Sequence, residues 1–356
     1  MTPAPRTLTR FLIEEQRRHS EATGNFTALV NDLRLACKRI ATLIGKGNLS
    51  GAYAPVGKVN AQGEAQIQLD VMANDIFIRT SEWGGQLAGM VSEETATPYL
   101  IPAEYPRGQY LLLFDPLDGS SNADVNVAVG SIFSVLRCPE GVIEPTEQDF
   151  LQAGTRQVCA GYAIYGPSTM IVLTTGRGVH GFTLDREVGE FILTHPDLRI
   201  PESTSEFAIN ASNHRHWEAA IKRYVGECQA GADGPRGRDF SMRWIASLVA
   251  ETHRILMRGG VFMHPRDRKD FSKAGRLRLL YEVNPIGFII EQAGGRASTG
   301  REPVLAVKPE SLHQRIGFVF GTASEVDRIE RYHREHNDFE FDAPLFGGRS
   351  LFRSPT

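Results

Sequence analysis

The clearest chemical signal in the sequence is a pair of aspartates, Asp115 and Asp118, separated by two residues. An uncharged run of aliphatic and aromatic residues, 110–114, directly precedes them and is typical of a short buried strand. Pro116 fixes its own φ angle and Gly119 permits a positive one, so we expect a sharp turn just past the strand end. Both carboxylates would then be held on a stiff turn at a sheet edge where ligands commonly bind.

Small residues after Asp118 add a second binding element. Gly119, Ser120 and Ser121 can direct backbone N–H groups at an anion, so the motif that ends at Asn122 combines a cation site with a phosphate site. The alternative is an ordinary acidic surface turn, because Asp-Pro and Asp-Gly are common turn dipeptides. The adjacent apolar strand places both acids beside the core and favours the metal-and-phosphate site.

Further acidic residues occur where apolar runs end or a helix begins. Glu93 and Glu94 follow the run 87–91, Glu282 follows the run 277–281, and Asp70 opens an expected helix. A carboxylate at the end of a buried strand needs a partner, and clustered carboxylates repel one another unless a cation neutralises them. Mg²⁺ takes such oxygen ligands and often shares the phosphates of a substrate. Taken singly, each acid is more typical of a solvated surface, a helix-start charge pair or a helix cap, and spacing alone does not bring them together.

Composition excludes several classes of function. The 356 residues indicate two fused subdomains, and a net charge of −3 with a pI near 6.4 gives no footprint for nucleic acid. A basic cluster over 266–278 is more typical of phosphate attraction than of nucleic-acid binding. Four scattered cysteines lack metal-site spacing and favour reduced thiols. With no bilayer-length apolar run and no signal-peptide pattern, we expect a soluble cytoplasmic protein without membrane partners.

Two halves of the chain show different patterns of predicted elements. A helix is expected over 25–44, then a loop over 45–68 and a second helix from about residue 70. Closely spaced strands predict an antiparallel meander at 131–136, 157–165, 169–174, 179–184 and 191–193. After a polar joint at 195–205, strands alternate with helices, which indicates an α/β second half. Its expected strands are 207–210, 261–263, 277–282 and 316–320. One expected helix ends near residue 225, and two others cover 242–257 and 284–292.

The motif Asp-Pro-Leu-Asp-Gly-Ser resembles the signature of the magnesium-dependent, lithium-sensitive sugar- and inositol-phosphate phosphatases. Its longer form, through Asn122, is similar to class I fructose-1,6-bisphosphatase. The resemblance extends over about residues 8–335, with matching blocks in order at 22–24 with Thr27, 69–71, 91–94, 115–122, 277–282 and 284–285. It implies a layered α/β/α/β/α sugar-phosphatase fold, with a mainly antiparallel N-terminal sheet and an α/β C-terminal half.

This resemblance also implies a division into domains and roles for the acids. Residues 1–198 would hold the metals and any allosteric site, 199–336 would bind the sugar phosphate, and 337–356 would be a loose or docked tail. Two to three Mg²⁺ ions, which Mn²⁺ could replace, would bind Glu64, Glu93, Asp115, Asp118, Glu282 and the carbonyl of Leu117. Asp70 and Glu94 would orient and deprotonate the attacking water.

Substrate residues carry over with several departures from the family pattern. Asp118, Gly119, Ser120 and Ser121 would contact the leaving phosphate, and Asn210, Arg243, His264 and Arg276 would hold the rest of the substrate. Arg243 would reach in from a neighbouring subunit of a homotetramer. Arg276 stands where the family usually has Lys, and Trp244, His264 and Asn213 stand where members have Tyr. For Trp244 and His264, core packing is an equally good interpretation.

Regulation by AMP stays open at this stage. Thr23, Gly24, Thr27 and Tyr110 match the family's AMP site, but Gln109 replaces a Lys and Asn25 a Glu. The same residues near 22–27 could simply cap a helix.

The expected reaction is hydrolysis of the 1-phosphate of D-fructose 1,6-bisphosphate, in gluconeogenesis or the Calvin cycle. Sedoheptulose-1,7-bisphosphatase, alone or as a second activity, is the nearest alternative. The block 277–282 argues against an inositol-phosphate phosphatase. A non-catalytic sugar-phosphate sensor is the alternative from another class, and retention of both Asp70 and Glu94 argues against it.

Overall fold

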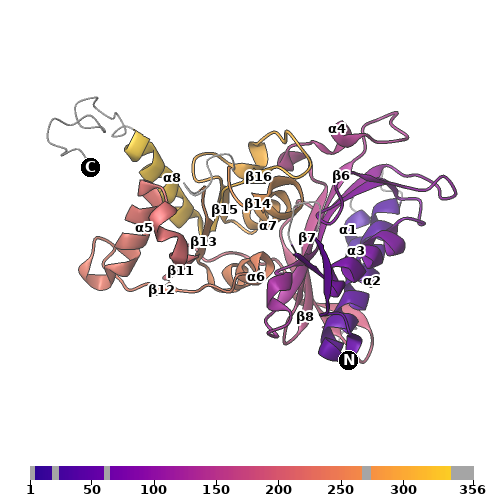
Figure 1. Ribbon diagram of the computed structural model, residues 1–356, viewed down its shortest axis with the longest axis horizontal. Helices are drawn as coiled ribbons and strands as arrows, with labels where there is room; N and C mark the ends of the chain where they lie inside the picture. The colour runs from indigo at the N-terminus through magenta and orange to yellow at the C-terminus, as the bar shows by residue number, and fades with distance from the viewer. Residues whose placement is uncertain (1–4, 18–23, 60–64, 267–273, 338–356) are drawn as a thin grey trace.

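A computed structural model describes residues 5–17, 24–59, 65–266 and 274–337. They form five layers, α/β/α/β/α, with two sheets between three layers of helices (Figure 1). The helices are α1 (Leu8–Gln16), α2 (Asn25–Lys46), α3 (Gln68–Ser81), α4 (Glu147–Phe150), α5 (Ala219–Gln229), α6 (Leu248–Arg258), α7 (Asn284–Gln292) and α8 (Ala323–Asn337). This arrangement is the layered α/β fold that the resemblance implied.

The N-terminal sheet has eight strands in the order β10-β9-β8-β7-β6-β5-β3-β4. Every neighbouring pair is antiparallel except β3 with β5, which is parallel. The predicted meander is therefore confirmed. The strands are β3 (Leu87–Ser92), β4 (Tyr99–Leu100), β5 (Tyr110–Asp118), β6 (Val129–Arg137), β7 (Cys159–Tyr165), β8 (Thr169–Thr174), β9 (His180–Asp185) and β10 (Glu190–His195).

The C-terminal sheet is mixed and has the order β12-β11-β13-β17-β15. Strand β11 pairs in parallel with β12 and β13, whereas β17 is antiparallel to β13 and β15. Its strands are β11 (Glu206–Ile209), β12 (Ser241–Met242), β13 (Val261–His264), β15 (Arg296–Ser298) and β17 (Phe318–Gly321). A separate antiparallel pair joins β14 (Leu277–Arg278) to β16 (Arg315–Ile316).

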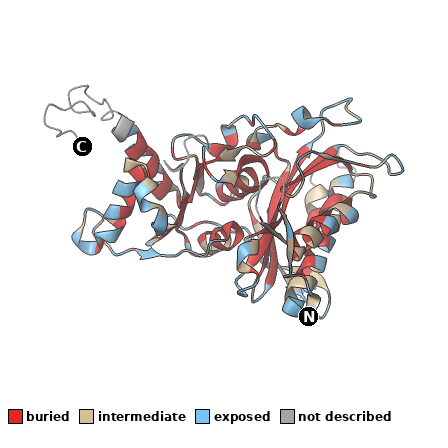
Figure 2. Ribbon diagram, in the orientation of Figure 1, coloured by how far each residue is buried: buried red, intermediate tan, exposed pale blue. Residues whose placement is uncertain are grey.

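Apolar cores fill the spaces between layers, and Figure 2 shows that the strands of the sheets are largely buried. Helices α1, α2 and α3 pack on one face of the large sheet, and α6 and α7 pack on its other face. Phe77 of α3 stacks on Phe114 of β5, with ring centroids 4.8 Å apart. This contact supports the strand segment immediately before Asp115, so the core fixes the start of the acidic motif.

Two elements around the motif differ from the sequence expectation. Strand β5 continues through Asp118, with an irregularity in its register between Asp115 and Asp118, so the turn comes at Gly119 and not at Pro116. The run expected as a strand over 277–282 is a strand only at Leu277–Arg278 and continues as a π-helix, Leu279–Val283. A short apolar run does not separate strand from buried helix by periodicity, which explains the second difference.

Other differences concern elements outside the motif. The segment expected as a loop contains a 3₁₀-helix, Gly47–Ser50, and an antiparallel pair of β1 (Pro55–Val59) with β2 (Ala65–Ile67). Helices α1 and α8 and strand β3 were not predicted. Helix α6 begins later than expected, because β12 and a connecting segment occupy 241–247. The tail beyond residue 337 lies outside the described residues.

Candidate active site

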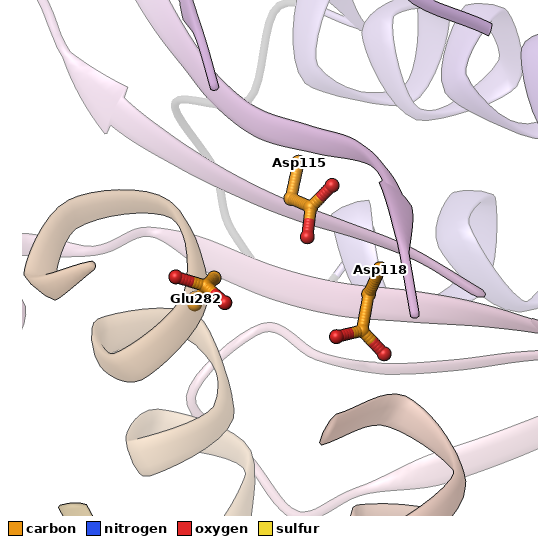
Figure 3. Close-up of side chains that lie close together, drawn as sticks. All are labelled: Asp115, Asp118 and Glu282. Atoms are coloured by element: carbon orange, nitrogen blue, oxygen red, sulfur yellow. The ribbon is translucent and has the colours of Figure 1, made fainter. Parts of the chain in front are cut away.

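Three buried carboxylates from distant parts of the sequence converge between the two halves of the protein. Asp115 and Asp118 lie on β5 and Glu282 lies in the π-helix, and one oxygen of each is within 4.8 Å of the others. Figure 3 shows the three side chains clustered in the space between strand and helix. An all-oxygen, carboxylate-rich set of donors suits a hard divalent cation. The structure therefore brings together three of the predicted metal ligands.

A fourth predicted ligand, Glu93, lies at the edge of this cluster. It directly follows β3, whose parallel register with β5 pairs Ser92 with Phe114 and so places Glu93 beside Asp115. Arg278 joins the two sides: its Nη2 is 3.0 Å from Glu93 Oε1, and its Nη1 is 3.7 Å from Glu282 Oε2. Its backbone N–H also donates to Glu282 Oε2 over 2.6 Å. The basic run had been noted in the sequence, but not that Arg278 enters the acidic cluster.

Burial and mutual repulsion change the acidity of the cluster. The pKa of Asp115 is raised well above its usual range, first by burial and then by the charges of Glu93, Asp118 and Glu282. Burial also raises the pKa of Glu282 to about 8, although Arg278 opposes this rise. The pKa of Asp118 is raised by burial against the effect of its hydrogen bonds. Each shift reflects the cost of holding negative charge here, which a bound cation would offset.

Asp118 is also bonded to the N-terminus of α6. Its carboxylate accepts hydrogen bonds from Ser247 Oγ at 2.8 Å, Leu248 N at 3.2 Å and Val249 N at 2.8 Å. Gly119 makes this approach possible, because its φ is +75° and a Cβ there would lie 2.8 Å from Ser247 Cβ. Position 119 therefore requires glycine for two reasons: its φ angle is positive, and a Cβ would lie too close to Ser247. The contact joins the N-terminal sheet to the C-terminal half.

The two acids assigned to the attacking water lie near the short strand β2. Asp70 is buried in the first turn of α3, and its Oδ2 accepts from Ile67 N over 2.8 Å. Glu94 is half-buried and accepts from the side-chain amide of Gln66. Adjacent residues of β2 therefore hold both carboxylates. Glu64, the predicted loop ligand, lies outside the described residues.

Part of the predicted sugar-phosphate site forms a pocket in the C-terminal half. Asn210, Asn213 and His264 line it, together with Trp217 and Met263. Asn210 follows β11 and His264 ends β13, so the parallel pairing of these strands brings both side chains to one edge. His264 therefore lines a pocket, and its contact with a ligand stays a prediction.

The remaining predicted substrate residues are arranged differently. Arg243 and Arg276 are exposed and do not line that pocket, and Arg243 Nε is 3.4 Å from Glu206 Oε1. Trp244 stacks almost parallel on Phe262, with centroids 5.9 Å apart, as core packing would require. Ser120 is half-buried and Ser121 is exposed, in the 3₁₀ turn that follows Gly119.

Residues matched to the AMP site lie at the start of α2 and on β5. Gly24 caps α2 with φ of +84°, and Thr27 Oγ1 donates to Gln16 Oε1 over 2.9 Å. The ring of Tyr110 is buried and meets Phe26 edge-on. The guanidinium of Arg137 lies 5.6 Å from the centre of the Tyr110 ring. The sequence pattern had not identified this cation. Thr23 lies outside the described residues.

Linked protonation gives the first prediction. The folded pKa of Glu282, about 8, exceeds its ordinary value of 4.5, so metal-free protein should lose stability as pH rises from about 4.5 through 8. A divalent cation displaces these protons, so the rise in Tm caused by Mg²⁺ should be larger at pH 8 than at pH 6. Differential scanning fluorimetry with and without Mg²⁺ measures this. Glu282→Gln should reduce the shift at pH 8, and an equal shift at both pH values in the parent would contradict the assignment.

Comparison with known proteins identifies the family that the sequence resembles, along nearly the whole chain. Residues 6–196 match the model for "Fructose-1-6-bisphosphatase, N-terminal domain", and residues 200–334 match the model for its C-terminal domain. A class 1 fructose-1,6-bisphosphatase of Hydrogenophilus thermoluteolus is 65% identical over 98% of both chains. Another, from Methylibium petroleiphilum, is 64% identical over 97% of both.

Solved structures agree with the sequence comparisons. The holo form of Leishmania major fructose-1,6-bisphosphatase superposes with a TM-score of 0.87 and 38% identity, over 93% of this chain and 100% of that one. Its apo form gives a TM-score of 0.82 and 37% identity, over 93% of this chain and 99% of that one. None of the described helices is long and apolar enough to cross a membrane. The chain belongs to the class 1 fructose-1,6-bisphosphatase family, and it is a phosphoric monoester hydrolase.

Proposed function

We propose that this protein hydrolyses the 1-phosphate of fructose 1,6-bisphosphate in a Mg²⁺-dependent reaction, giving fructose 6-phosphate and phosphate. The observation that carries the proposal is the buried cluster of Asp115, Asp118 and Glu282. Members of this family use a divalent metal, and two to three Mg²⁺ ions, or Mn²⁺ in their place, fit an all-oxygen donor set. Glu93 and the Leu117 carbonyl complete the proposed set, with Glu64.

Each group near the cluster has a proposed task in phosphoryl transfer. When bound, the cations would neutralise phosphoryl oxygens and acidify the attacking water. Asp70 and Glu94 would orient that water and accept its proton, and β2 supports this because it contacts both carboxylates. The backbone N–H groups of Gly119, Ser120 and Ser121 would bind the phosphate that leaves.

The sugar end of the substrate is proposed to bind over the mouth of the C-terminal pocket, whose own volume of about 10 Å³ has room for about one water molecule. Asn210 and His264 line this pocket and would contact the 6-phosphate end. Arg276 would add charge from the adjacent edge. The presence of His264 and Asn213 where family members have Tyr favours testing sedoheptulose 1,7-bisphosphate as a second substrate.

Domain organisation and assembly are proposed on the same basis. Family-model matches that end at residue 196 and restart at 200 support a boundary near 198. We propose a homotetramer in which the exposed Arg243 completes a neighbour's phosphate pocket. Four free cysteines support a cytoplasmic location. For AMP, Arg137 beside Tyr110 supplies a cation near the position where Gln109 replaces a lysine.

Phosphate release tests the proposed reaction directly. Purified protein should release phosphate from fructose 1,6-bisphosphate when Mg²⁺ is present and lose this activity in excess chelator. A parallel assay with sedoheptulose 1,7-bisphosphate measures the preference as a ratio of kcat/KM. A metal-independent rate, or no release from either sugar, would contradict the proposal.

Two carboxylate variants should fail for different reasons. Asp118→Asn removes a charged ligand, so the maximal rate should fall and the Mg²⁺ concentration for half-maximal activity should rise. Glu94→Gln removes a proton acceptor, so kcat should fall by about 10² or more while Mg²⁺ affinity is retained. Mg²⁺ titrations of activity, with Mg²⁺-dependent Tm as a second readout, compare them. Equal loss of Mg²⁺ affinity in both variants would refute this division of roles.

Subunit mixing tests whether Arg243 acts in its neighbour. Arg243→Ala and Asp118→Asn should each be nearly inactive, but hybrid oligomers should contain some sites with one intact copy of each residue. Activity should therefore reappear after subunit exchange, and the two variants mixed without exchange provide the control. If confirmed hybrids stay inactive, the sites are not shared through Arg243.

A further inference from the structure

The segment Arg243–Ser247, here called the strap, connects β12 to α6 and contacts the acidic motif. Within it, Ala246 has a φ of +61°, in the left-handed region that favours glycine. A non-glycine residue persists there when surrounding contacts hold it in place. The strap is therefore a strained connection between β12 and the α6 N-terminus, which binds Asp118.

Contacts from two sides hold the strap in this conformation. On the side of the motif, Asn122 Nδ2 donates to the carbonyls of Ile245 and Ala246, each at 3.1 Å. On the other side, Glu251 Oε1 accepts from Ile245 N over 2.7 Å. The peptide groups on either side of Ile245 are therefore fixed by a residue of the motif and by a residue of α6.

Glu251 belongs to a chain of charged groups that leads back to Arg243. Its Oε2 accepts from Arg254 Nε at 3.3 Å and Nη2 at 3.1 Å. Arg254 also pairs with Glu206, and Glu206 Oε1 is 3.4 Å from Arg243 Nε. The alternating charges therefore connect the first residue of the strap, Arg243, and its middle residue, Ile245, to the same arginine.

Helix stability alone does not account for a charge at position 251. Glu251 is 0% exposed, and a buried ion pair seldom stabilises a fold more than apolar residues of similar size. Helix α6 already has an N-cap, because Ser247 Oγ accepts from Ala250 N over 3.3 Å. Glu251 adds a hydrogen bond to the backbone of the strap at Ile245, which indicates that it fixes the conformation of the strap.

We propose that Glu251 is a positioning residue for the phosphatase reaction: it holds the strap so that Arg243 points toward a substrate phosphate. This inference rests on the proposed function, in which Arg243 completes a phosphate pocket. Asp118 keeps its own three bonds to Ser247, Leu248 and Val249, so removal of Glu251 should disturb phosphate binding more than metal binding.

Steady-state kinetics of the full-length protein test the proposal. Glu251→Ala removes both the strap bond and the partner of Arg254, and KM for fructose 1,6-bisphosphate should rise about tenfold, the effect of a lost charge-assisted hydrogen bond. Glu251→Gln keeps an acceptor for Ile245 N, so its KM should lie between those of Glu251→Ala and the parent. Half-saturation by Mg²⁺ should change less than about twofold in either variant.

A second substitution provides rescue. In Glu251→Ala, the left-handed Ala246 loses one of its restraints, whereas glycine adopts that conformation readily. Glu251→Ala combined with Ala246→Gly should therefore recover part of the lost affinity for substrate. Ala246→Gly alone should leave KM within about twofold of the parent.

A matched control separates positioning from general damage. Glu330 of α8 is also a buried, arginine-paired carboxylate, with Arg296 Nη2 at 3.2 Å, but within the described residues it makes no bond to the strap. Glu330→Gln should lower Tm without raising KM. If Glu251→Gln and Glu251→Ala keep the parent KM, or lose kcat and Mg²⁺ response together as a damaged site would, the positioning role is refuted. An inactive parent would instead refute the proposed function.

Discussion

Repulsion between buried carboxylates is the constraint on which this structure depends. Two unit charges 4 Å apart repel by about 4 kcal/mol at an effective dielectric constant of 20, and Asp115, Asp118 and Glu282 lie within 4.8 Å of one another. Three features reduce this cost in the protein itself: protonation, shown by the raised pKa values, the guanidinium of Arg278, and three hydrogen bonds to Asp118. A cation would remove most of what remains.

The same constraint explains why the active site needs both halves of the chain. Strand β5 supplies Asp115 and Asp118, but the groups that favour negative charge there come from beyond residue 240: the α6 N-terminus and the guanidinium of Arg278, which directly precedes the π-helix. The apolar core shared by the large sheet, α6 and α7 keeps these elements in register. Because the carboxylates of Asp118 and Glu93 belong to the N-terminal half and bond to groups of the C-terminal half, shifts between the halves would change the charge balance of the site.

Local sequence patterns predicted a large part of the N-terminal sheet and of the turn that carries the acidic motif. The antiparallel meander, the strand before Asp115 and the glycine turn follow from periodicity and turn chemistry. The gathering of Asp115, Asp118 and Glu282 was expected only through family resemblance. Arg278 and Glu251 were missed as participants, because pairings such as Arg278 with Glu93 join residues far apart in sequence and leave no local signal. The π-helix was missed because its apolar run reads equally well as a strand.

The permanent charge on Arg278 influences which carboxylates of the site are ionised when no metal is bound. A guanidinium stays protonated at any physiological pH, so it favours negative charge on its partners Glu93 and Glu282, although burial still raises the pKa of Glu282 to about 8. For Asp115, burial and three neighbouring acids raise the pKa well above its usual range, so this carboxyl retains a proton more readily than an ordinary aspartate. A cation held by these carboxylates would displace protons from Asp115 and Glu282 and would compete with Arg278 for Glu282. Only the displacement of protons depends on pH, because Arg278 stays charged, and this displacement favours cation binding as pH rises.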